Sequence, residues 1–124
     1  VATCLAAELG FDAVGIEIEE ELIAVSQQLA SDHHINAEFV AGSFVPPEHE
    51  DFFDMLGDFN WVRTDGHSAY EELDLDPDDF DVVYCYPWPG EEAMSEELFA
   101  ECGASGSLLL SFHGREGMRL RRRV

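Results

Sequence analysis

The sequence contains no lysine and few basic residues of any kind. Its 124 residues include 27 Asp and Glu against 6 Arg, and the net charge is −21. Residues 1–114 hold one Arg against 26 acidic residues, a charge of −25. A surface this acidic repels phosphate backbones and anionic lipid, so binding to nucleic acid or to an acidic membrane is not expected. We rank adaptation to high salt first among interpretations, because salt screens the self-repulsion of an acidic surface.

Cysteine and long apolar segments are also scarce. Cys4, Cys85 and Cys102 are widely spaced without a CxxC pair, which favours a reduced, cytoplasmic compartment over a disulfide framework. No apolar run approaches the roughly 20 residues that span a bilayer. No secretory signal pattern opens the chain. The hydrophobic fraction of 46% nevertheless suffices for a folded domain.

Hydrophobic periodicity predicts an alternation of helices and strands. The helix that follows the acids at 19–21 is expected to bury Leu22, Val25 and Leu29, with Ile23 and Ala30 beside them. Residues 45–79 form an irregular insertion with short helices expected at 51–59 and 68–73. Outside it, we expect helices at 1–9, 19–32 and 91–102, and strands at 13–18, 36–41, 80–86 and 106–112. This order favours one α/β domain over 1–124, Rossmann-like and doubly wound, with a mostly parallel sheet and helices on both faces.

Ligands of such folds bind outside the carboxyl ends of the strands. Glu17, followed by Ile18, ends the strand at 13–18, and a carboxylate there can accept hydrogen bonds from both ribose hydroxyls of a nucleoside cofactor. A solvated acid at the strand end is the alternative, and we favour the ligand role.

Two further strand ends are candidates. Gly42 and Ser43 are small enough for an adenine ring to approach the backbone, and Phe44 could stack on that ring; an ordinary turn is an equal alternative. The run Cys85–Tyr86–Pro87–Trp88 joins aromatic residues to rigid prolines and could form an apolar wall where cofactor and acceptor meet. A hydrophobic plug between sheet and helix is the alternative.

A metal site is not expected. The acids between Asp74 and Asp81 resemble a calcium loop, but Asp79 and Cys85 stand where that loop needs Gly and Glu. The histidines are scattered and lack zinc spacing. We therefore interpret the acidic run as a solvated loop.

Together these segments resemble the class I S-adenosylmethionine-dependent methyltransferases. Residues 14–18 resemble that family's second strand with its acidic ribose ligand, and 39–44 its third strand and adenine loop. Residues 80–84 resemble its fourth strand, and 103–112 its fifth. The resemblance implies a cofactor-binding domain with S-adenosylmethionine held by Glu17, Ile18, Gly42, Ser43, Phe44, Cys85 and Tyr86, and an acceptor lined by Pro87 and Trp88.

The sequence departs from this family in two ways. The glycine-rich loop that follows the family's first strand is absent, so we expect a fragment that lacks that strand, with a gap in the sheet between the strands at Val14 and Val82. Ser43 stands where the family often carries an acid that contacts the adenine amine.

The resemblance implies methyl transfer from a sulfonium to an unknown acceptor. Asp65, His67 and Tyr70 are candidates for a general base if one is needed, although each is expected to be a loop surface residue. The alternatives are a non-catalytic binding or assembly module, a nicotinamide-dependent oxidoreductase and an aminopropyl transferase. Neither the acceptor nor the oligomeric state follows from the sequence.

Overall fold

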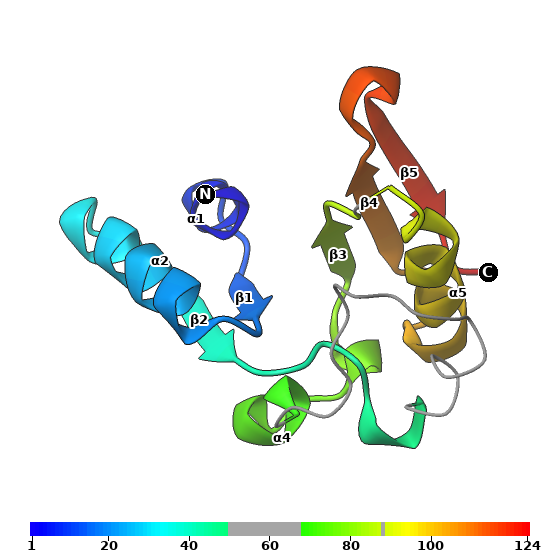
Figure 1. Cartoon of the computed structure of the whole chain (residues 1–124), viewed down its shortest axis with the longest axis horizontal. Coiled ribbons are helices and arrows are strands. Elements are labelled where there is room, and N and C mark those ends of the chain that lie inside the picture. Colours follow the sequence, from blue (N-terminus) through cyan, green and yellow to red (C-terminus); the bar gives the residue numbers. More distant parts are fainter. Residues whose placement is uncertain (50–67, 88) are drawn as a thin grey trace. The chain divides into compact units, whose positions relative to one another are not determined.

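The computed structural model describes residues 1–49, 68–87 and 89–124 (Figure 1). The chain divides into two compact units, Val1–Asp74 and Leu75–Val124, which we describe separately. The helix expected at 51–59 lies outside the described residues. No helix in the described part of the chain has the length and apolar character needed to cross a membrane.

The first unit is built around a strand–helix–strand segment. Strands β1 and β2 pair in parallel, with Val14 opposite Glu38 and Glu17 opposite Ala41. The expected helices and strands of this unit are confirmed, with ends that shift by one or two residues. Its elements are α1 (Ala2–Glu8), β1 (Val14–Glu17), α2 (Glu20–Asp32), β2 (Glu38–Ala41), the 3-10 turn η1 (Pro47–His49) and α4 (Ala69–Leu73).

The buried face of α2 differs from the expected one. Ile23 and Ala30, two turns apart, are buried, as is Val40 of β2. Leu22 and Val25 remain 48% and 66% exposed, so the prediction that they face the core is wrong. The apolar residues of α2 occupy two neighbouring faces, and packing against the strands selected the face that carries Ile23.

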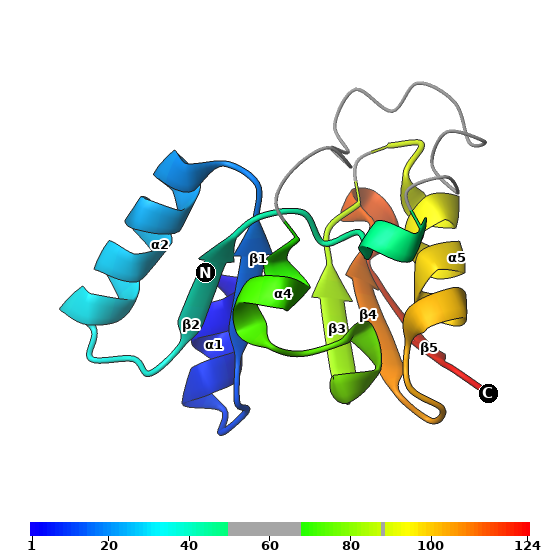
Figure 2. The ribbon, with the colours of Figure 1, turned by 90° about the horizontal axis from the view of Figure 1, so that it is seen from below.

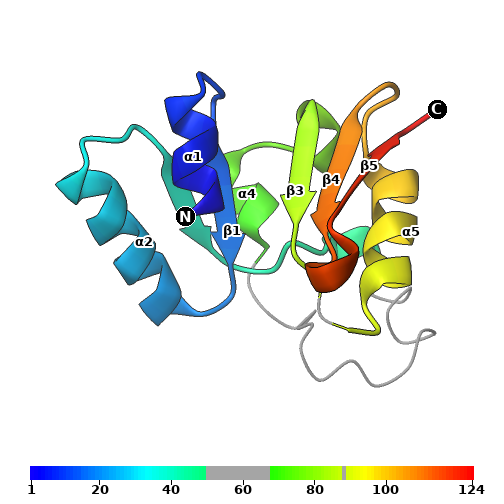
Figure 3. The same ribbon diagram turned by 90° about the horizontal axis from the view of Figure 1, so that it is seen from above.

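Helix α1 lies on the face of this two-stranded sheet that carries Gly15 (Figures 2 and 3). A Cβ atom at Gly15 would come within 2.8 Å of Cδ1 of Phe39 and 2.9 Å of Oγ1 of Thr3. Glycine at this position therefore permits the close approach of Thr3 of α1 and of the Phe39 ring to β1.

The second unit packs one helix on a three-stranded sheet. Strand β3 pairs in parallel with β4, and β4 pairs antiparallel with β5. Met94 and Leu98 of α5 are buried and lie in the core with Leu109. The elements are η2 (Pro77–Asp79), β3 (Val82–Cys85), α5 (Glu92–Cys102), β4 (Leu108–Phe112), η3 (Gly114–Glu116) and β5 (Met118–Arg122).

Strand β5 was not predicted from the sequence. It returns along β4 after a turn in which the N–H of His113 donates to the carbonyl of Gly117 (2.8 Å). Arg121 and Arg119 of β5 form ion pairs with Glu96 of α5, at 3.0 Å and 3.8 Å. The Arg-rich segment is thus an edge strand tied to the helix.

The expected fold class is wrong. The described strands form a two-stranded parallel sheet, β1–β2, and a separate three-stranded mixed sheet, β3–β4–β5, rather than a mostly parallel doubly wound sheet. A doubly wound sheet is continuous, but no pairing joins the strands that start at Val14 and Val82 among the described residues. The antiparallel return of β5 makes the second sheet mixed.

We expect Gly15→Ala to destabilise the chain by about 1–3 kcal/mol, because the added methyl group overpacks the contact of β1 with Thr3 and Phe39. The midpoint of urea unfolding measures this change. In a Phe39→Leu background, Gly15→Ala should cost less stability than it does in the unsubstituted chain, because the smaller side chain relieves part of the overpacking. Equal losses in both backgrounds would contradict the steric explanation.

We expect the thermal midpoint to rise when KCl is increased from about 0.1 M to about 2 M. Screening shortens the Debye length from about 10 Å to below about 3 Å, which weakens the repulsion of a chain of charge −21. The ion pairs of Glu96 with Arg119 and Arg121 are also screened, but exposed pairs contribute only about 0–1 kcal/mol each. Scanning calorimetry at several salt concentrations checks this, and a midpoint that falls with salt would contradict it.

Candidate functional site

The carboxyl ends of β1 and β2 bring Glu17 and Gly42 together. The N–H of Gly42 donates to the backbone carbonyl of Glu17 at 2.9 Å. The Oε1 atom of Glu17 accepts hydrogen bonds from the N–H groups of Ile18 (2.9 Å) and Glu19 (3.2 Å). These bonds hold the carboxylate at the strand end. Oε2 has no hydrogen-bond partner in the part of the chain that the structure describes, so it is available to a ligand.

Ser43 and Phe44 follow β2 and take different positions. Ser43 is buried, and its Oγ accepts a hydrogen bond from the N–H of Val45 (3.1 Å). Phe44 is partly exposed, at 39%. Hydrogen bonds to two backbone carbonyls hold this turn: the Ser43 carbonyl accepts from the N–H of Ala69 (3.2 Å), and the Phe44 carbonyl accepts from Oη of Tyr70 (2.8 Å).

These contacts refine the expected roles in the first unit. Ser43 supports the turn through its hydroxyl, whereas Phe44 is partly exposed beside the strand ends. Tyr70, a candidate general base, donates its phenolic hydrogen to a backbone carbonyl. Asp65 and His67, the other two candidates, lie outside the described residues.

In the second unit, Cys85 ends β3 opposite Ser111 of β4. Burial raises the pKa of the Cys85 thiol; a hydrogen bond with Ser95 lowers it, and the negative charge of Glu96 raises it. A thiol with a raised pKa is neutral at pH 7 and is therefore a poor nucleophile or metal ligand. This environment favours a structural role for Cys85.

The aromatic residue after Cys85 lies on the surface. Tyr86 is 64% exposed, and its ring is tilted against that of Phe112, with 5.3 Å between the ring centroids. Pro87 is buried, and Trp88 lies outside the described residues. Of the aromatic and proline residues predicted to form an apolar wall, the structure therefore describes an exposed Tyr86 and a buried Pro87.

Sequence analysis missed a polar pair beside this strand end. Oγ of Ser111 lies 2.6 Å from Nε2 of His113, and Ser111 is buried. Backbone N–H groups of Glu92 and Gly90 hold the pKa of the nearby Glu92 carboxyl below its usual value, and the charges of His113 and Arg119 add to this effect. The signal was the serine two residues before a histidine at the end of an apolar strand.

The acidic loop has a local structural explanation. Carboxylate oxygens of Asp76, Asp78 and Asp79 lie within 4.8 Å of one another, and all three residues are exposed. Asp79 accepts a hydrogen bond from the N–H of Asp76 (2.8 Å) as part of a capping box at η2. The cluster therefore serves a turn, in agreement with the solvated loop that we expected.

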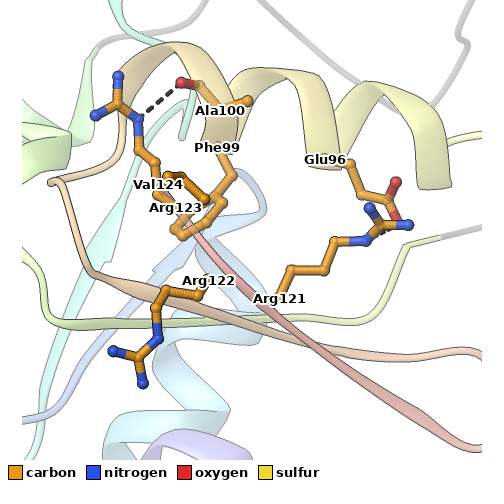
Figure 4. A pocket seen from close by; sticks show the side chains of 7 residues that line it. All are labelled: Glu96, Phe99, Ala100, Arg121, Arg122, Arg123 and Val124. Atoms are coloured by element: carbon orange, nitrogen blue, oxygen red, sulfur yellow. Dashed lines mark hydrogen bonds and ion pairs between the residues drawn. The ribbon is translucent and has the colours of Figure 1, made fainter.

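A cavity of about 390 Å³ lies between α5 and the end of β5 (Figure 4). Its three arginines do not converge on one point. Arg121 extends to Glu96, and Nε of Arg123 donates to the carbonyl of Ala100 (2.8 Å). The side chain of Arg122 points away from both of these groups (Figure 4). The cavity therefore lacks the convergent guanidinium groups that an anion site needs.

We expect slow alkylation of Cys85 at neutral pH, with a rate that rises as the pH approaches the raised pKa of its thiol. Ser95→Ala should slow the reaction further, because the hydrogen bond with Ser95 stabilises the thiolate. Mass spectrometry after timed iodoacetamide treatment measures the rate, with Ser26→Ala on α2 as the matched control. Faster alkylation in Ser95→Ala would contradict this account.

Comparison with known proteins gave no match: no protein-family model matches the chain, and neither a curated protein nor a solved structure does. The candidate sites therefore rest on the chain's own geometry.

Proposed function

We propose that this chain binds S-adenosylmethionine and takes part in methyl transfer to an acceptor. The observation that carries the proposal is the Glu17 carboxylate at the carboxyl end of β1, beside the end of the parallel strand β2. Parallel strands joined by a helix form nucleoside sites at this edge, and a carboxylate there suits the two hydroxyls of a ribose.

The surroundings of Glu17 support a nucleoside ligand. Two backbone N–H groups orient one carboxylate oxygen, which leaves the other to accept from a hydroxyl. A preoriented acceptor loses little conformational freedom on binding. Phe44 is partly exposed beside this strand end and is the residue that an adenine base would contact.

These residues would hold the adenosine part of the cofactor. S-adenosylmethionine supplies a methyl group that its sulfonium sulfur already activates. The chain's own contribution is to bind and orient, which is the main protein contribution when a cofactor carries the chemistry. A neutral Cys85 thiol is consistent with this division, because the proposal asks for no covalent step on the protein.

Calorimetric titration of the chain with S-adenosylmethionine tests the proposal. We expect Glu17→Gln to weaken binding about tenfold or more, because it removes a charge-assisted hydrogen bond to the ribose. Phe44→Ala should weaken binding of both S-adenosylmethionine and adenosine.

The matched control is Glu38→Gln, at the exposed opposite end of the same sheet, and it should leave the affinity unchanged. Absence of binding by the folded chain at millimolar ligand would refute the proposal. Equal losses in Glu17→Gln and Glu38→Gln would also refute the assigned site.

A further inference from the structure

One face of the β3–β4–β5 sheet is apolar and lacks a covering helix. The helix α5 lies on the other face. There the Cys85 side chain forms a hydrogen bond with Ser95 of α5, and Glu96 of α5 forms ion pairs with Arg119 and Arg121. No second α-helix occurs among the described residues of this unit. The alternation of side chains along each strand fixes which residues the uncovered face carries.

The strand register arranges this uncovered face as three rows of three residues. The apolar residues on the two outer sides of this face are 37–64% exposed, and Arg122 is exposed as well. The β4 residues between them are half-buried. The rows are Val82–Leu108–Arg122, Tyr84–Leu110–Leu120 and Tyr86–Phe112–Met118.

The charge on this face is exceptional for the chain. The nine positions contain no acid and one arginine, whereas the whole sequence has 27 acids and a net charge of −21. Exposed apolar patches of this kind mark interaction sites in soluble folds. An acid-free face is also where two copies of so acidic a chain can approach with least repulsion.

We propose that this face is a self-association surface, on which the same face of a second copy packs as a two-layered sandwich. Two-fold dimers are the commonest homo-oligomers, and facing sheets pack with their strands about 30° apart. A two-fold axis parallel to β4 lays β3 of one copy over β5 of the second copy.

This arrangement makes the contacts complementary. Tyr84 comes over Leu120 of the second copy, and Tyr86 over Met118 of the second copy, a favourable contact of sulfur with an aromatic ring. Arg122 comes over the start of β3 of the second copy, where the exposed Asp81 precedes Val82. Leu110 lies near the axis and faces Leu110 of the second copy.

The size of the face sets the expected strength. Strands of five residues are about 16 Å long and lie about 4.8 Å apart, so three strands offer a face of about 16 by 14 Å. Stable interfaces bury about 800 Å² per partner, which is more than this face supplies. The dimer should therefore be weak, with a dissociation constant of roughly 10 µM to 1 mM.

Sedimentation velocity of the full chain at about 0.1 M and about 2 M KCl tests the association. We expect the dimer fraction to grow with salt, because salt screens the repulsion between copies and strengthens apolar contact. A chain that stays monomeric up to about 1 mM in high salt would overturn the proposal, as would dissociation by salt.

Substitutions locate the surface. Leu120→Asp should raise the dissociation constant about tenfold or more without unfolding, since Leu120 is 64% exposed. Val25→Asp, on α2 and 66% exposed, is the matched control and should leave association unchanged. Equal effects of the two variants would overturn the assignment to this face.

A cysteine at the axis tests the symmetry. Leu110→Cys should be cross-linked into a covalent dimer by a short bis-maleimide, because the two copies of this residue face each other across sheets about 10 Å apart, a separation that a direct disulfide cannot bridge. The unsubstituted chain controls for Cys4, Cys85 and Cys102, and Val25→Cys controls for exposed thiols. A dimer that dissociates with Leu120→Asp but never cross-links through Leu110→Cys would overturn the two-fold arrangement.

Discussion

Parallel strand pairing is the constraint on which both candidate regions depend. β1 pairs with β2, and β3 with β4, and each pair places the carboxyl ends of its strands at one edge. That edge gathers Glu17 with Gly42 in the first unit and Cys85 with Ser111 in the second. Because parallel strands require a crossover, each pair also brings a helix, α2 or α5, against its sheet.

Charge organises the second unit in a different way. Glu96 of α5 pairs with two arginines of β5, so the basic end of a very acidic chain is held against its own helix. These pairs occupy one face of β5 and leave Met118 and Leu120 on the other. The same alternation therefore produces an ion-paired face and an apolar face.

Local sequence patterns predicted much of the secondary structure and part of the candidate site. Both strands of the first unit and helix α5 were predictable, since hydrophobic periodicity is a local signal. Strand β5 was missed because its arginines obscured the alternation after Gly117. The pairing of Ser111 with His113 was missed because two residues at spacing two become neighbours only once the strand end is in place.

The sequence alone determined the acidity, the order of helices and strands, and the position of Glu17 at a strand end. Only the tertiary structure decided that the strands form two sheets rather than one, that α2 buries Ile23 instead of Val25, and that Ser43 supports a turn. The physical reason is that strand pairing, helix rotation and burial depend on contacts between distant residues, whereas propensity and periodicity report on neighbours along the chain.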